Sequence, residues 1–282
     1  MADPRTTRVL RQHLETERLL GVEAVPADAA TLAAAADAAR RSVAATPGAT
    51  PSTPRAWAQP PARGGGSQPG GTPLSDLPGT PLPERVAGDA AASLRVLDEQ
   101  AVRGCTRCGL HAGRTQTVFG AGDPAAALMI VGEGPGAEED RAGQPFVGAA
   151  GEILDKQLAA MKLSREAVYI ANVVKCRPPD NRTPSSAEAA TCGAYLRAQI
   201  EIVLPRVILT VGGPAAKLVL GVTRGITQVR GTWHTYDGPG GPIPVMPTFH
   251  PAYLLRAYTP ENRRRVWEDL QAVMERLGDG AG

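Results

Sequence analysis

The sequence predicts an α/β protein with three α/β/α layers and a four-stranded parallel sheet, preceded by a helical and disordered N-terminal extension. Two observations support this prediction. Short, unbroken apolar runs alternate with helical segments, and such strands are typical of a parallel sheet covered on both faces. Glycine-rich and polar clusters directly follow the runs, where such sheets bind ligands. The apolar runs cover residues 125–131, 167–174, 206–211 and 244–248. The helical segments cover residues 152–161, 186–202 and 214–220 and much of the chain after His250-Pro251.

Composition divides the 282 residues into three parts. Residues 1–45 predict short helices, and residues 46–90 are rich in proline and glycine. Such a stretch buries too little apolar surface to offset its loss of conformational entropy, so we expect a disordered linker there. Residues 91–282 alternate like a globular domain and are long enough for one full core.

Charge and hydropathy by themselves exclude few classes of protein or partner. The net charge of +2 argues neither for nor against a polyanionic partner. Arginines gather in the last quarter of the chain, which predicts either a basic face or a solvated helix surface. No run of about 20 apolar residues occurs, so we expect no membrane partner. Because residues 1–5 hold no apolar targeting stretch, we expect a cytoplasmic, reducing environment.

Four cysteines carry the strongest chemical signal. Cys105 and Cys108 lie in a short turn that can present two thiolates to one ion, whereas Cys176 and Cys192 stand apart in the sequence. Disulfides would require an exported chain. Zinc sites usually combine two close pairs or a mixture of cysteine and histidine. One pair with two distant single cysteines therefore favours an iron–sulfur cluster narrowly over zinc, and buried thiols are the third interpretation.

A glycine-rich loop, Gly132-Glu-Gly-Pro-Gly136, follows the first apolar run. It formally matches a dinucleotide-binding pattern. However, Pro135 removes a backbone N–H where pyrophosphate would bind, and acidic residues follow. We therefore interpret the glycines as letting the backbone close around a flat, neutral ligand, with Phe146 as an aromatic face for stacking. The competing interpretation is that Phe146 is an ordinary core residue.

Two polar residues stand at the ends of later runs. Asn172 interrupts the second run, where its amide could anchor a loop or read the edge of a nucleobase. His250 follows the fourth run and precedes a proline that fixes the turn. A histidine in this place, beside Leu254, Leu255 and Arg256, is a functional candidate, because the same turn could present an apolar wedge and a phosphate-binding cation.

Together these segments resemble the family 4 uracil-DNA glycosylases, the iron–sulfur branch of the uracil-DNA glycosylase superfamily. The resemblance runs from Cys105 to the C-terminal helices. It rests on the cysteine spacing and on Gly132-Glu-Gly-Pro-Gly136, Pro145-Phe-Val-Gly148, Asn172 with Lys175-Cys-Arg-Pro178, and His250-Pro-Ala-Tyr-Leu-Leu-Arg256. The resemblance implies the four-stranded parallel sheet. It also implies a structural [4Fe–4S] cluster held by Cys105, Cys108, Cys176 and Cys192.

The resemblance also implies an activity. The reaction would be hydrolysis of the N-glycosidic bond of deoxyuridine in single- or double-stranded DNA, which releases uracil and starts base excision repair. The residues implied to bind uracil are Glu133, Gly134, Phe146, Asn172 and His250. Of these, Glu133 and His250 would be catalytic, and we expect His250 to contribute more. Leu254 matches the wedge that enters the DNA, and Arg256 would contact phosphate.

The chain differs from related enzymes at positions that bear on function. Gly134 replaces the aspartate of the best-known branch, which is normal for family 4 and leaves the role of Glu133 open. Gly136 replaces an aromatic residue that excludes thymine there, so Glu139 or Asp140 could shape the pocket instead. The alternative function is a non-catalytic or covalent uracil-DNA-binding protein with a structural metal cluster. A covalent relative carries a nucleophilic histidine where residues 176–184 of this chain have none, which disfavours irreversible capture.

For the whole chain we expect a monomer in a bacterial cytoplasm, associated in function with the nucleoid. The predicted helix over residues 5–20 could dock a repair or replication partner, and the alternative is that the N-terminal region is merely a tether.

Overall fold

The computed structural model describes residues 72–77, 81–238 and 240–278. The helices predicted over residues 1–45, and residues 46–71 of the predicted linker, lie outside the described residues. The partner expected for the N-terminal helix therefore stays a prediction. Within the described ranges, no helix combines the length and apolar character that crossing a membrane requires.

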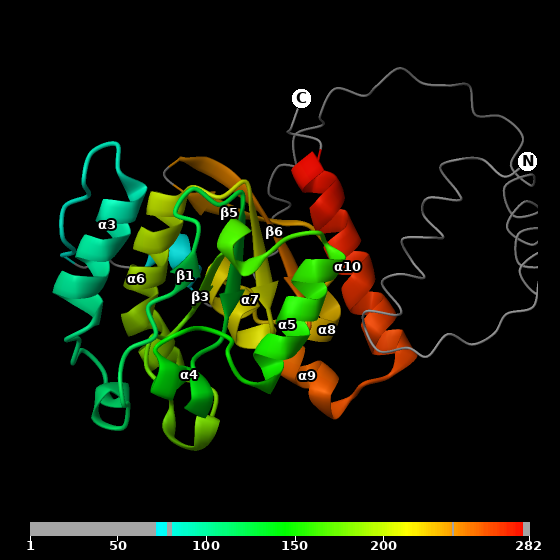
Figure 1. Cartoon of the computed structure of the whole chain (residues 1–282), viewed down its shortest axis with the longest axis horizontal. Coiled ribbons are helices and arrows are strands. Elements are labelled where there is room, and N and C mark those ends of the chain that lie inside the picture. The colour runs from blue at the N-terminus through cyan, green and yellow to red at the C-terminus, as the bar shows by residue number, and fades with distance from the viewer. Residues whose placement is uncertain (1–71, 78–80, 239, 279–282) are drawn as a thin grey trace, which may run out of the picture. The chain divides into compact units, whose positions relative to one another are not determined.

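One six-stranded sheet organises the described residues, with the strand order β1-β3-β2-β4-β6-β5 (Figure 1). The four inner strands run parallel to one another, which confirms the four predicted apolar runs. Two edge strands that the sequence did not predict pair antiparallel to β3 and β6. The strands are β1 Ala121–Gly122, β2 Leu128–Gly132, β3 Tyr169–Asn172, β4 Val207–Val211, β5 His234–Gly238 and β6 Gly241–Thr248.

Helices and short helical turns connect these strands. The α-helices are α3 Ala90–Leu97, α4 Ala137–Ala142, α5 Ala149–Ala160, α6 Ser186–Val203, α7 Gly213–Leu220, α8 Ile226–Val229, α9 Pro251–Arg256 and α10 Pro260–Gly278. The short turns are η1 Leu74–Asp76, η2 Asp98–Val102, η3 Gly109–Ala112, η4 Arg165–Ala167 and η5 Pro179–Asn181.

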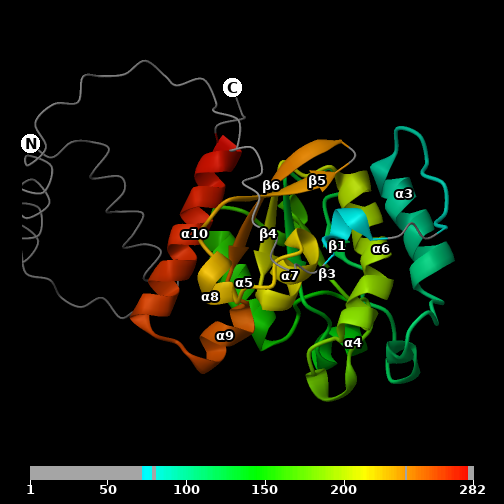
Figure 2. The ribbon, with the colours of Figure 1, turned by 180° about the vertical axis from the view of Figure 1, so that it is seen from behind.

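Alternate side chains of the inner strands face two separate hydrophobic layers. On β2, Met129 and Val131 join the cluster that contains residues of α3, α6 and α7. Leu128 and Ile130 join the cluster that contains residues of α5, α9 and α10. Figures 1 and 2 show α3 and α6 on one side of the sheet and α5 and α10 on the other. Burial on both faces explains the continuous apolar runs and confirms the three-layer α/β/α class.

The end of the predicted linker packs against the domain. Leu74 is fully buried, and the side chains of Leu74 and Leu77 lie against Gly193 of α6. A Cβ at Gly193 would lie 2.8 Å from the Cδ1 of Leu77, so the missing side chain makes room for this segment. Arg197 donates a hydrogen bond of 2.6 Å to the Leu77 carbonyl. The packed part of the chain therefore begins before residue 91, the boundary that composition indicates.

The carboxyl ends of the inner strands meet at one edge of the sheet. Gly132 ends β2 directly opposite Asn172, which ends β3. Gly212 follows β4, and its backbone N–H bonds the carbonyl of Thr248 at the end of β6. His250 comes two residues later, at the start of α9. The polar residues that the sequence places at separate strand ends therefore lie around one edge, where parallel sheets bind ligands.

Candidate active site

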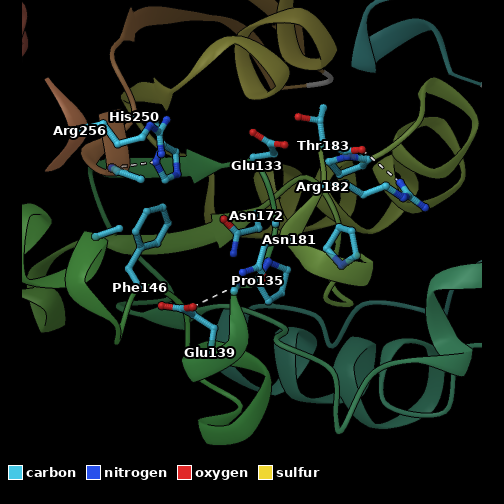
Figure 3. A pocket seen from close by; sticks show the side chains of 16 residues that line it. Glu133, Pro135, Glu139, Phe146, Asn172, Asn181, Arg182, Thr183, His250 and Arg256 are labelled. Carbon is cyan, nitrogen blue, oxygen red and sulfur yellow. Dashed lines mark hydrogen bonds between the residues drawn. The ribbon is translucent and has the colours of Figure 1, made fainter. Parts of the chain in front are cut away.

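A pocket of about 420 Å³ opens at this edge of the sheet (Figure 3). Its walls are the loop after β2, the turn before α5, the loop after β3 and the start of α9. All the predicted base-binding residues line it, together with the predicted phosphate contact: Glu133, Gly134, Phe146, Asn172, His250 and Arg256. The fold thus brings these residues together from four distant parts of the sequence.

The glycines after β2 are required for space. A Cβ at Gly132 would overlap the Oδ1 atom of Asn172 and lie 2.6 Å from the Cζ atom of Phe146. A Cβ at Gly134 would lie 2.7 Å from a methyl group of Val174. Neither glycine has a positive φ, so close approach of neighbouring side chains, not backbone conformation, is what each glycine permits.

Glu139 joins two walls of the pocket. Its Oε2 accepts a hydrogen bond of 3.0 Å from the N–H of Gly136, at the end of the glycine loop. Its Oε1 accepts bonds of 2.9 Å from the N–H groups of both Val147 and Gly148. Asp140 is buried instead and accepts two hydrogen bonds from the N–H of Thr115. Of the two acidic residues predicted to shape the pocket, Glu139 is therefore the one that lines it.

Phe146 is both a core residue and a wall of the pocket. Its side chain belongs to the hydrophobic cluster beneath α5, and the residue is only 5% exposed. Its ring stacks against the ring of His250, with centroids 5.6 Å apart and planes inclined by 29°. Figure 3 shows Phe146 and His250 on the same side of the pocket. The two interpretations offered by the sequence, core and ligand wall, therefore both apply to this ring.

Asn172 lines the pocket and carries an unpaired acceptor. The residue is 2% exposed, and its Oδ1 atom has no hydrogen-bond partner among the described residues. Leaving a buried carbonyl unpaired costs about 1–3 kcal/mol. Because this oxygen belongs to a residue that lines the pocket, a ligand with an N–H donor would recover that cost. In the competing interpretation Asn172 would anchor a loop, and the same oxygen would accept a hydrogen bond from a backbone N–H.

His250 is arranged as a neutral hydrogen-bond donor. It caps α9, and its Nδ1 accepts a bond of 3.1 Å from the N–H of Ala252. Since a backbone N–H can only donate, the proton of the neutral ring lies on Nε2. Burial, and to a smaller extent the nearby Arg256, lowers the pKa of His250 to about 4, and Glu139 opposes this shift. At neutral pH the ring therefore offers one N–H without a net charge.

Glu133 stands at the other side of the pocket. Burial raises the pKa of its carboxyl group, and a hydrogen bond with the side chain of Thr183 opposes this shift. Thr183 belongs to the wall that sequence reasoning missed, formed by Pro178, Asn181, Arg182, Thr183 and Pro184. Arg182 is held there by two bonds of 2.8 Å to Glu188. The signal for this wall in the sequence is a run of prolines and polar residues directly after Cys176.

The structure buries Leu254, the residue that the sequence predicts as the wedge. Leu254 is 2% exposed and packs in the hydrophobic cluster with α5 and α10, so it does not face solvent. Leu255 is 47% exposed on the same short helix. Successive residues of an α-helix point about 100° apart, so burying one of two adjacent leucines turns the other outward. Arg256 lines the pocket and is exposed, as a phosphate contact requires.

The four cysteines line one small cavity beside β3 and α6. Each of three sulfur atoms has a donor close by. Arg114 Nη1 lies 3.1 Å from Cys176 Sγ, the N–H of Lys175 lies 3.3 Å from Cys192 Sγ, and the hydroxyl of Tyr195 lies 3.2 Å from Cys105 Sγ. Within the described ranges, no three His, Cys, Asp or Glu side chains are arranged to hold a single metal ion.

A buried lysine connects this cavity to the pocket. Lys175 is 1% exposed and precedes Cys176 in the chain. Its ammonium group donates bonds of 2.8 Å to the backbone carbonyl of Asn172 and 2.6 Å to the Oε1 atom of Gln199. The side chain of Gln199 in turn donates to the carbonyl of Phe119 and the hydroxyl of Tyr169. The backbone at the end of β3 is therefore held by a buried ammonium group that makes two hydrogen bonds.

Comparisons with known proteins agree with this arrangement. Residues 119–271 match the model of the uracil DNA glycosylase superfamily. The chain is 50% identical to the type-4 uracil-DNA glycosylase of Thermotoga maritima over 171 residues, which cover 60% of this chain and 88% of that protein. It is 40% identical to the type-4 uracil-DNA glycosylase of Sulfurisphaera tokodaii over 65% of this chain and 84% of that protein. A type-5 uracil-DNA glycosylase of Pyrobaculum aerophilum is 31% identical over 57% of this chain and 75% of that protein.

The low pKa of His250 predicts how stability depends on pH. Between its folded value of about 4 and its ordinary value of 6.5, the unfolded chain binds a proton that the folded chain does not. The contribution of neutral His250 to the free energy of unfolding is therefore lost as pH falls through that window. Urea unfolding at pH 7 and pH 5 should show the wild type losing about 2 kcal/mol more stability than His250→Gln. Equal losses in the two proteins would mean that His250 is not held neutral.

Proposed function

The chain belongs to the uracil DNA glycosylase superfamily, and we propose that it acts in the type-4 branch by excising uracil from DNA. Water would add to C1′ of deoxyuridine while the N1–C1′ bond breaks. The bonding electrons would leave with uracil, and the water proton would end on the released base. The products are free uracil and an abasic site.

The unpaired Oδ1 atom of Asn172 is the observation that carries this proposal. Uracil has an N–H at position 3 beside a carbonyl at position 4. Asn172 would accept from the N–H and donate its amide hydrogen to the carbonyl. Cytosine has no hydrogen at N3, so it would leave the buried oxygen unpaired. The cost of about 1–3 kcal/mol for that unpaired group would then count against cytosine.

His250 is proposed to stabilise the leaving group. When the N1–C1′ bond breaks, negative charge develops on the uracil ring, in part on O2. A fixed N–H donor that faces developing charge is usually the largest single contribution to catalysis. His250 has its Nδ1 occupied by the N–H of Ala252, which leaves Nε2–H to make this bond. A neutral donor also avoids a buried positive charge in the free enzyme.

The pocket can take only a base that has left the helical stack. Extruding a nucleotide costs a few kcal/mol, and less in single-stranded DNA. Phe146 would recover part of that cost by stacking on the extruded ring, since aromatic stacking on a base contributes about 1–3 kcal/mol. Glu133 faces the same space with its carboxyl held by Thr183. We propose that it orients water or supports the positive charge that develops on the sugar.

Leu255 and Arg256 are proposed to contact the DNA around the extruded nucleotide. Leu255 is exposed at the turn that follows His250, and Val147 is 44% exposed beside Phe146. Apolar side chains of this kind can fill the gap left in the stack. Arg256 lines the mouth of the same pocket, where phosphate would pass.

We also propose that the four cysteines hold an iron–sulfur cluster. A [4Fe–4S] cluster takes one thiolate on each iron, so its ligands surround a volume larger than one ion. The four cysteines line a shared cavity and hydrogen-bond donors approach their sulfur atoms, which fits such a group. When bound, the cluster would supply four iron–sulfur cross-links between segments. Lys175 directly precedes Cys176 and donates a hydrogen bond to the backbone carbonyl of Asn172. A cluster bound to Cys176 would therefore help to fix the position of Asn172.

Uracil release from a labelled oligonucleotide tests the function directly. The wild type should release free uracil from single-stranded DNA containing one deoxyuridine, and the abasic product should break in alkali. His250→Ala should lower the single-turnover rate by about 100-fold to 1,000-fold. Glu133→Ala should lower it less than His250→Ala does. Binding of uracil-DNA without release, or a larger loss in Glu133→Ala than in His250→Ala, would contradict this account.

The same assay separates the two leucines of α9. Leu255→Ala should slow excision from double-stranded DNA more than from single-stranded DNA, because only a duplex has a gap to fill. Leu254→Ala is the matched control. Since Leu254 is buried, its truncation should lower the free energy of unfolding by about 2–5 kcal/mol without that strand preference.

Metal analysis tests the cluster. Protein purified without oxygen should contain about four iron atoms per chain, with matching acid-labile sulfide and a broad visible absorption. The Cys192→Ser variant should lose iron as well as stability. Stoichiometric zinc in place of iron would contradict the assignment while leaving the glycosylase proposal untouched.

A further inference from the structure

Phe146 has a backbone conformation that an aromatic residue does not adopt by preference. Its φ is +54°, in the left-handed region. For a residue other than glycine this conformation costs about 1–2 kcal/mol, and it persists only where surrounding contacts impose it. The direction in which the ring leaves the backbone depends on this φ. The contacts that hold the backbone of Phe146 therefore also decide where its ring lies in the pocket.

Arg165 makes the contacts that fit this requirement. Its Nη1 donates a bond of 3.0 Å to the carbonyl of Pro145, and its Nη2 donates to the carbonyl of Phe146 itself. A guanidinium group is planar and presents its N–H groups in a fixed fork, so two successive carbonyls can be held at once. Its Nε donates a bond of 2.5 Å to Asp155 on α5.

Other groups close the remaining sides of this turn. Gly151 of α5 lies so near the carbonyl of Phe146 that a Cβ there would overlap it. On the far side of Phe146, Glu139 accepts from the N–H groups of Val147 and Gly148. Arg165 holds the carbonyls, Glu139 holds the N–H groups, and α5 blocks movement between them. The turn is thus fixed on both sides of the strained residue.

Arg165 lies just before the strand that ends at Asn172. It lies in η4, directly before β3, and Asn172 ends that strand. Figure 3 shows Phe146 and Asn172 as neighbours in the pocket, whereas Arg165 is not among the pocket-lining residues. A shift of Phe146 relative to Asn172 would separate the surface that stacks on the base from the group that reads its edge.

We propose that Arg165 is a positioning residue for uracil excision, which holds Phe146 in its strained conformation so that the ring covers the extruded base. The inference rests on the proposed glycosylase function. The bonds to the two carbonyls carry the effect. The ion pair with Asp155 does not, because Asp155 is 52% exposed and exposed pairs contribute little.

A double-mutant cycle tests whether Arg165 acts through the ring. Arg165→Gln should lower the single-turnover rate on single-stranded uracil-DNA by about 10-fold to 100-fold, because two bonds from a charged group are lost. In the Phe146→Leu background the same change should cost less than about 3-fold. Asp155→Asn, the matched control, should stay within about 3-fold of the wild type. Equal losses from Arg165→Gln in both backgrounds would show a general structural role and overturn the proposal.

Fluorine NMR provides a readout that needs no activity. The chain contains three phenylalanines, so labelling with 4-fluorophenylalanine gives three signals, and Phe146→Leu identifies one of them. Arg165→Gln should shift or broaden the Phe146 signal and leave those of Phe119 and Phe249 in place. An unchanged Phe146 signal would overturn the proposal. If all three signals collapse because the variant unfolds, Arg165→Lys, which keeps the charge but loses the fork, takes its place.

The two readouts separate failure of this inference from failure of the proposed function. A wild type that releases no uracil, with a Phe146 signal that still depends on Arg165, would reject the glycosylase function and keep the positioning role. An active wild type whose Phe146 signal and double-mutant cycle show no dependence on Arg165 would keep the glycosylase function and reject the positioning role.

Discussion

The pocket depends on the absence of a side chain at Gly132. This residue ends β2 directly opposite Asn172 on β3, and a Cβ there would overlap the amide oxygen and press on the ring of Phe146. Any larger residue would therefore push apart the two groups that we propose contact the same base. The glycine-rich loop resembles a phosphate-binding loop in sequence, but its glycines admit neighbouring side chains. The steric constraint explains why the amide and the ring can lie so close together.

Unfavourable features are concentrated around this point, as is common at functional sites. Asn172 keeps a buried oxygen unpaired, His250 is held without charge, and Phe146 occupies a left-handed conformation. Nearby contacts hold these three residues in place. Lys175 fixes the carbonyl of Asn172, the N–H of Ala252 sets the tautomer of His250, and the turn around Phe146 is held by Glu139 and Arg165. These supports lie in the layers that the sheet and helices provide.

Sequence reasoning succeeded where burial leaves a pattern. The inner strands are covered on both faces, so they read as apolar runs, and their ends mark the site. It missed β1, with two residues, and β5, which is polar, because neither carries that pattern. Motif spacing could not show that Leu254 is buried and Leu255 exposed, since this depends on how a short helix rotates against the core. Nothing in the sequence indicates the role of Arg165, because every residue type has a backbone carbonyl that such a side chain can bond.

The central claim is that the unpaired oxygen of Asn172 reads the N3–H of uracil. Inhibition of excision by free bases tests it most directly, because the substituents can be varied one at a time. Uracil and 1-methyluracil should both inhibit, since N1 carries the sugar in DNA and does not face Asn172. 3-Methyluracil should inhibit at least about 10-fold more weakly, because its methyl group replaces the hydrogen that the oxygen would accept. Equal inhibition by uracil and 3-methyluracil would contradict the account.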